Sequence, residues 1–381
     1  MNFPLDIIQN TPTPFYLYDL KLLHNTLDAC ISESNKYGYH VHYALKANTN
    51  NEILQIIKEK GFGADCVSGN EIKKAIEIGF ESKNIAFAGV GKSDAEINIA
   101  LDHNIFSFNC ESLPELEVIN EIAKGRSQVA DVALRINPNV NAKTHHYITT
   151  GLEENKFGIN MWEMDDLLEK LPNLSNINLI GIHFHIGSQI TDLSVFRGLC
   201  IRVNEIQEYF VKKHVQLKHI NVGGGLGVDY ENPDTNAISD FATFFKIFNE
   251  HLKLLPDQQL HFELGRCLVA QSGSLITKVL YVKNGVKTNF AIVDAGMTEL
   301  IRPALYQSYH HIENISNPSE ANEKYDVVGP ICESSDCFGK AVKMPHTQRG
   351  NYIAIRTTGA YGEVMASAYN LRDRVKAVYI N

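Results

Sequence analysis

The segment His40-Val41-His42-Tyr43-Ala44-Leu45-Lys46-Ala47-Asn48, residues 40–48, joins a strand-like run to a lysine at its end. Its β-branched and aromatic side chains favour a strand over residues 40–46, and a polar turn follows. Burial at a strand end lowers the pKa of an amine, which then becomes neutral and can attack a carbonyl. The alternative is that Lys46 extends from the strand end into solvent. The segment alone leaves both interpretations open.

Seven further segments repeat the pattern of a short strand, a turn and a helix. A longer polar stretch, residues 137–160, follows the fifth strand. Eight strands alternating with helices over about 225 residues are typical of an α/β fold of the (β/α)8 barrel type. An open, doubly wound sheet is the alternative with the same alternation. The expected strands are residues 40–46, 63–67, 85–88, 105–108, 131–136, 179–185, 219–222 and 259–263.

From about residue 268 the helical pattern gives way to β-rich segments. We expect strands over residues 274–283, 289–294, 324–328, 351–357 and 374–380. The N-terminal strand candidate, residues 15–18, is assigned to the same sheet-rich part. The sequence therefore predicts a barrel domain over residues 24–267 and a mainly β domain made of residues 1–23 and 268–381.

The composition excludes several classes of protein. The chain has 381 residues, 44% of them hydrophobic, and a formal charge of −9 without a basic block, which argues against nucleic-acid binding. No apolar run approaches the roughly 20 residues that span a bilayer. The N-terminal residues lack a signal-like pattern, and the seven cysteines have no tight spacing framework, so we expect a cytoplasmic protein with reduced thiols. Cys332 and Cys337 have no second close pair, which argues against a zinc site.

Polar residues collect where the expected strands end. In a barrel the C-terminal strand ends surround one mouth, and that mouth holds the active site. A barrel that needs only stability has no use for such a set at one end. The set offers an amine, a histidine, carboxylates, guanidinium groups and a glycine-rich turn: Lys46, Asp65, Arg135, His185, Ser188, Gly223 to Gly225, Glu263 and Arg266.

The turn Gly223-Gly224-Gly225-Leu226-Gly227 comes directly after the seventh expected strand. Backbone amides without side chains can approach an anion, and a phosphate site after strands seven and eight recurs in barrels. The dinucleotide pattern G-x-G-x-x-G fails, because Val228 stands where the third glycine belongs. A tight turn without a ligand is the alternative.

His183 and His185 lie two residues apart on the sixth expected strand and so face the same way. A metal pair is one interpretation, but strands seven and eight offer no matching histidine and aspartate set. We expect His183 to be a core histidine and His185, nearer the mouth, to stack on a planar ligand. Glu263 ends the eighth strand and needs a cationic partner, either a protonated ring nitrogen or Lys46 itself.

A reactive lysine, a phosphate-binding turn, a stacking histidine and a carboxylate for a ring nitrogen are together what pyridoxal 5′-phosphate requires. The chain resembles the diaminopimelate decarboxylase family, within the alanine racemase-like (fold type III) pyridoxal phosphate enzymes. The resemblance runs nearly end to end. Its motifs are residues 43–48, 63–65, 156–159, 183–190, 221–227, 263–266, 294–297, 301–306, 329–334 and 359–362.

The resemblance implies a role for each matching position. Lys46 would hold the cofactor covalently, His185 would stack on its ring, and Glu263 would pair with the ring nitrogen. Cys332 would donate a proton after carbon dioxide leaves. Cofactor contacts are implied for Lys46, Asp65, Arg135, His185, Ser188, Gly224, Gly225, Glu263, Gly265, Arg266 and Tyr361, and substrate contacts for Arg266, Arg302, Tyr306, Glu333 and Tyr361.

The implied reaction is decarboxylation of meso-2,6-diaminopimelate to L-lysine. The family also implies a homodimer, in which Cys332 and Glu333 reach into the neighbouring subunit's site. Decarboxylation of carboxynorspermidine, ornithine or arginine on the same scaffold is the nearest alternative, and the arginines would be less useful to a polyamine substrate. A non-catalytic pyridoxal phosphate carrier is the alternative of a different class.

Overall fold

The computed structural model describes residues 3–140 and 156–381, so the polar stretch expected over residues 137–160 falls largely outside the described residues. The chain forms two compact units. One consists of residues 27–227 and 240–265, and the other of residues 1–26, 228–239 and 266–381. The domain boundaries expected from the sequence stay a prediction, because a compact unit need not be an independently folding domain.

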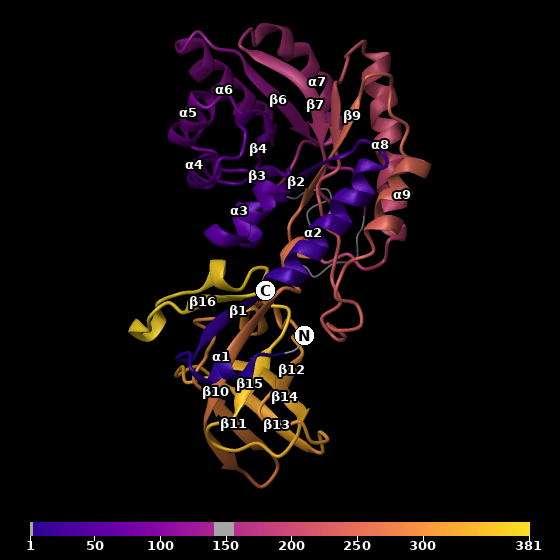
Figure 1. Cartoon of the computed structure of the whole chain (residues 1–381). Helices are drawn as coiled ribbons and strands as arrows, with labels where there is room; N and C mark the ends of the chain where they lie inside the picture. The colour runs from indigo at the N-terminus through magenta and orange to yellow at the C-terminus, as the bar shows by residue number, and fades with distance from the viewer. Residues whose placement is uncertain (1–2, 141–155) are drawn as a thin grey trace. The chain divides into compact units, whose positions relative to one another are not determined.

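The first unit is a closed barrel of eight parallel strands, as predicted from the alternating pattern. The strands pair in chain order, and β9 closes the barrel against β2, with His42 opposite Glu263. Helices lie on the outside of the strands (Figure 1). The strands are β2 (His40–Ala44), β3 (Gly63–Cys66), β4 (Ile85–Phe87), β5 (Ser107–Cys110), β6 (Ala130–Arg135), β7 (Ile177–His183), β8 (His219–Asn221) and β9 (Gln259–Leu264).

Capping residues set the sharp turns from strand to helix. Asn50, Ser68 and Ser112 each accept a hydrogen bond from a backbone amide in the first turn of the next helix. Ser93 and Glu96 form a reciprocal capping box. The helices are α2 (Leu20–Asn35), in which the boundary between the units falls, α3 (Asn51–Glu59), α4 (Gly69–Ile78), α5 (Asp94–Asp102), α6 (Leu113–Gly125), α7 (Met164–Lys170), α8 (Ser194–Lys212) and α9 (Phe241–His251).

Two strands, β2 and β7, end two residues earlier than the sequence predicts, and both ends carry site residues. β2 ends at Ala44, and Leu45–Ala47 forms a single 3₁₀ turn, so Lys46 lies just beyond the strand. β7 ends at His183, and the chain turns away through Gly187, which has a φ of 135°. His185 therefore lies in the loop after β7. Both residues remain at the C-terminal end of the barrel.

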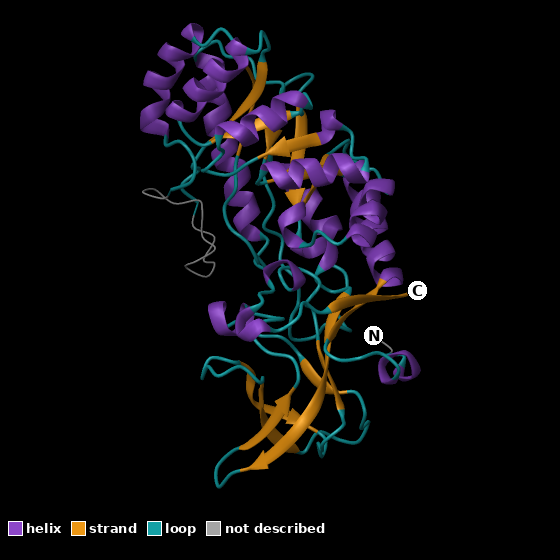
Figure 2. Cartoon of the chain, turned by 90° about the vertical axis from the view of Figure 1, so that its left-hand side faces the viewer, coloured by secondary structure: helices purple, strands orange, loops and turns teal. Residues whose placement is uncertain are grey.

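The second unit is built on an eight-stranded sheet, and its regular secondary structure is mainly strand, which Figure 2 shows in orange. Its main path runs β12-β15-β10-β11-β13-β14, and β1 pairs with β10 and β16. The elements are α1 (Leu5–Gln9), β1 (Phe15–Asp19), α10 (Arg266–Val269), β10 (Gly273–Asn284), β11 (Asn289–Val293), α11 (Arg302–Tyr306), β12 (Ile312–Asn314), β13 (Glu323–Val328), β14 (Cys337–Met344), β15 (Tyr352–Ile355) and β16 (Lys376–Ile380).

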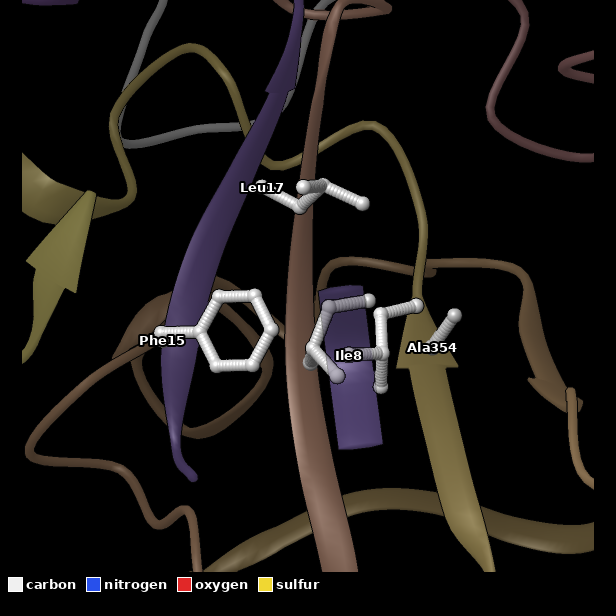
Figure 3. Packing of buried hydrophobic residues seen from close by; sticks show 5 residues of the cluster. Ile8, Phe15, Leu17 and Ala354 are labelled. Carbon is white, nitrogen blue, oxygen red and sulfur yellow. The ribbon is translucent and has the colours of Figure 1, made fainter. Parts of the chain in front are cut away.

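The N-terminal residues belong to the core of this unit. Ile8 of α1 packs with Phe15, Leu17, Ile276 and Ala354 from β1, β10 and β15, and all five side chains are fully buried (Figure 3). The antiparallel register of β1 and β10 places Phe15 opposite Ile276. Burial of this apolar surface therefore ties α1 and β1 to strands more than 250 residues later in the chain.

Among the helices of residues 3–140 and 156–381, none is both long enough and apolar enough to cross a bilayer.

Candidate active site

Lys46 and Asp65 meet at the C-terminal end of the barrel. Nζ of Lys46 lies 3.2 Å from Oδ2 of Asp65, whose side chain is fully buried. Oδ1 of Asp65 has no hydrogen-bond partner among the described residues. Burial raises the pKa of Asp65 to about 7, and the charge of Glu263 adds to the rise while Lys46 opposes it. Lys46 thus has a buried acidic neighbour, and that neighbour has an unused oxygen.

Glu263 is held by three side chains inside the barrel. Its Oε1 accepts hydrogen bonds from Nδ2 of Asn109 at 2.9 Å and from Nδ2 of Asn221 at 2.7 Å. Its Oε2 lies 2.8 Å from Nε2 of His183. Burial raises the pKa of this carboxyl, but the His183 ring and the Lys46 charge outweigh burial and hold the pKa below its usual value. Glu263 is therefore a buried carboxylate fixed in one orientation.

The glycine turn after β8 has no room for side chains. Gly223 and Gly225 have φ values of 67° and 105°, which favour glycine. A Cβ atom on Gly224 would lie 2.0 Å from the carbonyl oxygen of Glu263. Across the turn, the amide of Ile190 donates to the carbonyl of Gly225 at 2.8 Å. The turn is therefore packed against β9 and against the loop that carries Ser188.

His185 lies beside this turn. Its Nδ1 is 3.5 Å from the amide nitrogen of Gly224. Burial, together with the charges of Lys46 and Arg135, lowers the pKa of His185 well below its ordinary value, so the ring is neutral at pH 7. A neutral, half-buried imidazole can stack on a planar ring without a charge penalty.

Arg135, at the end of β6, is already paired. Its Nη1 lies 2.6 Å from Oε1 of Glu111, and its guanidinium lies 4.8 Å from the ring centroid of Phe157. The other Glu111 oxygen accepts a hydrogen bond from the amide of Gly158 at 2.8 Å. Arg135 and Glu111 together hold the Lys156–Ile159 motif, and a direct cofactor contact of Arg135 stays a prediction.

The remaining predicted residues divide between the two units. Gly265, after β9, has the methyl groups of Ala44 and Ala47 within 3.1 Å of where its Cβ would lie, so it allows β9 to approach the Lys46 turn. The predicted residues in the sheet-rich unit are Arg266, Arg302, Tyr306, Cys332, Glu333 and Tyr361.

Arg266 and Arg302 pack against tyrosine rings within the sheet-rich unit. Arg266 lies 4.8 Å from the ring centroid of Tyr361, and Arg302 lies 5.9 Å from that of Tyr306. Tyr361 has a φ of 57°, an uncommon conformation for a large side chain and one that often marks a functional position.

Cys332 and Glu333 lie between β13 and β14 and are both exposed. The hydroxyl group of Tyr369 donates to Oε1 of Glu333 at 2.9 Å. These two residues are thus on the surface of the sheet-rich unit, accessible to another molecule.

Four residues that contribute to these contacts had no role assigned from the sequence. They are Asn109, Glu111, Asn221 and Tyr230, of which Asn221 lies in the motif 221–227. Asn109 and Asn221 carry a usable signal, because asparagine is depleted in buried strands and each lies near the end of one. Tyr230 has no such signal, because only the fold brings it close to Arg266 and Arg302.

The barrel residues fit pyridoxal phosphate. The Lys46 amine suits the aldehyde of the cofactor, and the unused Oδ1 of Asp65 suits the polar edge of its ring. The turn at Gly223 to Gly225, which has no side chains, suits the phosphate. The fixed carboxylate of Glu263 suits the ring nitrogen. Across residues 3–140 and 156–381, no three histidine, cysteine, aspartate or glutamate side chains group so as to hold a metal ion.

Comparison with known proteins agrees with this site. Residues 24–270 match the family described as pyridoxal-dependent decarboxylase, pyridoxal binding domain, so pyridoxal 5′-phosphate is confirmed as the cofactor. The chain is 56% identical to the diaminopimelate decarboxylase of Bacteroides thetaiotaomicron over 98% of this chain and 97% of the relative. It is 38% identical to the Aquifex aeolicus diaminopimelate decarboxylase over 98% and 88%.

A crystal structure of Helicobacter pylori diaminopimelate decarboxylase complexed with L-lysine superimposes with a TM-score of 0.93 and 40% identity, covering 99% of this chain and 94% of that one. Similarity of sequence and of fold therefore extends over both units. The chain belongs to the diaminopimelate decarboxylase family of pyridoxal-dependent decarboxylases.

Proposed function

We propose that this protein decarboxylates meso-2,6-diaminopimelate to L-lysine and carbon dioxide, the last step of lysine biosynthesis. The observation that carries the proposal is the Lys46 amine 3.2 Å from a buried Asp65, beside the fixed carboxylate of Glu263 in a barrel of the pyridoxal-dependent family. The enzyme is accordingly a carboxy-lyase acting on an amino acid.

Each barrel residue has a proposed task toward the cofactor. Lys46 holds it covalently through its amine, and His185 covers one face of the ring. Backbone amides at Gly224 and Gly225 and the hydroxyl group of Ser188 hold the phosphate, where positive φ values at Gly223 and Gly225 support an anion-binding turn. Further cofactor contacts are proposed for Asp65, Arg135 and Gly265 of the barrel and for Arg266 and Tyr361 of the sheet-rich unit.

When bound, pyridoxal phosphate supplies an aldehyde for the substrate amine and a ring that accepts the electron pair left by carbon dioxide. Glu263 keeps the ring nitrogen protonated. Support comes from its three hydrogen-bond partners and its lowered pKa, which keep the carboxylate ionised at the pH of the reaction. An ionised, buried carboxylate stabilises an adjacent cation strongly because little water screens it.

The substrate's distal end carries a second amine and a second carboxylate, so its recognition needs both charges. Arg302 provides a cation for the distal carboxylate, and Glu333 provides an anion for the distal ammonium group. Arg266, Tyr306 and Tyr361 complete the proposed contacts. Burial of Arg302, whose side chain lies among aromatic rings, supports a site from which much of the water is excluded.

Cys332 would donate the proton on its Sγ to the carbon that has lost carbon dioxide. We propose that Cys332 and Glu333 act in the neighbouring subunit of a homodimer. Their exposure on a single chain supports this arrangement. We also propose a cytoplasmic location, which is supported by seven free cysteines, since reduced thiols persist in a reducing compartment.

Purified protein supplied with pyridoxal phosphate and meso-diaminopimelate tests the function. We expect carbon dioxide and L-lysine in equal amounts, and borohydride should fix the cofactor to Lys46. Lys46→Ala should lose both the fixed cofactor and the activity. Turnover of ornithine, arginine or carboxynorspermidine without turnover of diaminopimelate would show that the substrate is wrong, and cofactor binding without any turnover would favour a carrier.

Mixed dimers test the shared site. Lys46→Ala and Glu333→Ala should each be inactive alone. Mixing the two after mild dissociation should restore about a quarter of wild-type activity, because half of the dimers then contain one intact site. Activity that stays at the level of the separate variants would contradict a site completed across the interface.

A further inference from the structure

A segment between β8 and α9 belongs to the sheet-rich unit, although the chain on both sides of it belongs to the barrel. Residues 228–239, which we call the strap, are anchored there by polar contacts. The carboxylate of Asp234 pairs with the fully buried guanidinium of Arg356, at 2.7 Å and 3.2 Å. Nε2 of Gln271 donates to the backbone carbonyl groups of Asp229 and Asn236. The strap is therefore fixed at three points.

The strap places Tyr230 between two arginines. Nη1 of Arg266 donates to the Tyr230 hydroxyl oxygen at 2.6 Å, and Nη2 of Arg302 approaches the same oxygen at 3.4 Å. The two guanidinium groups also lie 6.0 Å and 5.7 Å from the centroid of the Tyr230 ring. His310 packs edge-on against this ring at 5.1 Å. Like charges repel, so two buried guanidinium groups stay together only if something between them accepts hydrogen bonds.

The cluster offers hydrogen-bond donors, and no carboxylate of the described residues pairs with Arg302. The hydrogen bonds of Arg302 go to the hydroxyl groups of Tyr230 and Ser308. His310 turns Nδ1 to the backbone carbonyl of Arg356, and burial lowers the pKa of its ring to about 3, so it adds no charge. Tyr230 accepts from arginine, and its own hydroxyl proton has no acceptor among the described residues. Such a set is complementary to a carboxylate.

We propose that Tyr230 is a positioning residue that holds Arg266 and Arg302 in register for the carboxylate that the product retains. This inference rests on the proposed function for the identity of the substrate, and it goes beyond that function by assigning the strap a part in specificity. Decarboxylation removes one carboxylate of diaminopimelate and leaves the other in L-lysine. Tyr230 would thus contribute to binding of substrate and product alike, and little to the chemical step.

Tyr230→Phe tests this with two ligands that differ only in the carboxylate. L-Lysine carries it, whereas cadaverine has the same chain and both amines without it. On the cofactor-loaded protein, we expect the variant to bind L-lysine about tenfold more weakly and to bind cadaverine within about twofold of wild type, because one hydrogen bond to a charged group is lost. The cofactor's absorption change on ligand binding is the readout. KM for diaminopimelate should rise by a similar factor with kcat almost unchanged.

Tyr281→Phe is the matched control. Tyr281 is also a tyrosine beside an arginine, with Arg349 at 5.0 Å from its ring centroid, but it is 60% exposed and outside the cluster. It should leave both affinities unchanged. Equal weakening of L-lysine and cadaverine in Tyr230→Phe, or no weakening of either, would overturn the inference. If wild type does not turn over diaminopimelate, the proposed function fails, and the comparison of the two ligands is still informative about Tyr230.

Discussion

Nε2 of His183 lies 2.8 Å from Oε2 of Glu263, so the histidine of β7 binds the carboxylate of β9 inside the barrel. His183 was expected to be a core histidine, and it is 1% exposed. Its other nitrogen, Nδ1, has no partner among the described residues. His183 is therefore a core residue with an electrostatic role as well, since its ring helps to keep Glu263 ionised.

Glu263→Gln should lower kcat at least about 100-fold, because it removes a preorganised charge from a buried site while keeping the shape of the side chain. Lys46 should still capture the cofactor, since its amine and its contact with Asp65 are unchanged. Steady-state kinetics together with borohydride fixation separates the two effects. A variant with more than half of the wild-type kcat would show that the carboxylate charge is dispensable.

Asp65→Asn should stabilise the cofactor-free protein at pH 8 and not at pH 4. The pKa of Asp65 is raised from 3.8 to about 7 by burial, so the folded state holds its proton more tightly than the unfolded state does. Stability due to this group is therefore greatest at low pH and is lost as pH rises through the interval from 3.8 to 7. Asparagine removes that loss, and we expect more than about 1 kcal/mol at pH 8. Urea unfolding at the two pH values measures it, and an equal effect at both would contradict the assignment.

Three buried histidines form a chain near the starts of the barrel strands. Nδ1 of His42 lies 3.0 Å from the carbonyl oxygen of Asn84, and Nε2 of His42 lies 2.9 Å from Nδ1 of His261. The carbonyl can only accept, so His42 carries its proton on Nδ1 and accepts from His261. The ring of His219 packs edge-on against His261 at 5.1 Å. Burial lowers the pKa of all three rings, that of His219 to about 3.

The contribution of these three histidines to stability should therefore fall as pH falls below about 6.5, the ordinary pKa of histidine. Above that value both folded and unfolded states hold neutral rings, and below it only the unfolded state gains protons. Each histidine contributes at most about 1.4 kcal/mol per pH unit to this slope. His219→Gln should reduce the slope of unfolding free energy against pH between 4.5 and 6.5, whatever its effect at pH 7.5. An unchanged slope would show that His219 titrates normally.

Gly224→Ala should abolish cofactor binding or folding, because the added Cβ would lie 2.0 Å from a backbone oxygen that cannot move without displacing β9. Gly198→Ala is the matched control. Gly198 lies inside α8, and nothing is within 4 Å of where its Cβ would be. Alanine there should stabilise the protein by about 0.5–1 kcal/mol with full activity. Thermal unfolding and cofactor content are the measurements, and a Gly224→Ala protein with normal cofactor content would contradict the packing argument.

The barrel was predictable because each strand–turn–helix repeat carries local sequence signals that agree with the global fold. Ser68, Ser93 and Ser112 cap their helices where the pattern changes from strand to helix. β12 and β14 were missed in the sheet-rich unit. They form the two ends of the main path of the sheet, and β12 has only three residues. β14 carries Gly339 and two lysines, so its apolar alternation is weak in the way that edge strands often are.

The site was only partly predictable. Asp65 and Glu263 lie near the C-terminal ends of β3 and β9, and Lys46 lies just after β2. Parallel strands bring their C-terminal ends together, so the sequence pattern suffices to group these residues. Tyr230 was missed for the opposite reason. Its meeting with Arg266 and Arg302 depends on which unit residues 228–239 join, and no local pattern indicates that.

Parallel pairing of β1 with β16 places Phe15 opposite Lys376. During synthesis from the N-terminus, Phe15 leaves the ribosome some 360 residues before its partner does, by subtraction of the two residue numbers. All barrel strands have been synthesised once the chain reaches Leu264, whereas the two strands that pair with β1, β10 and β16, are synthesised later. Nascent chains should thus carry an unpaired, apolar N-terminal strand for most of translation, and this strand is where chaperones would be expected to bind first.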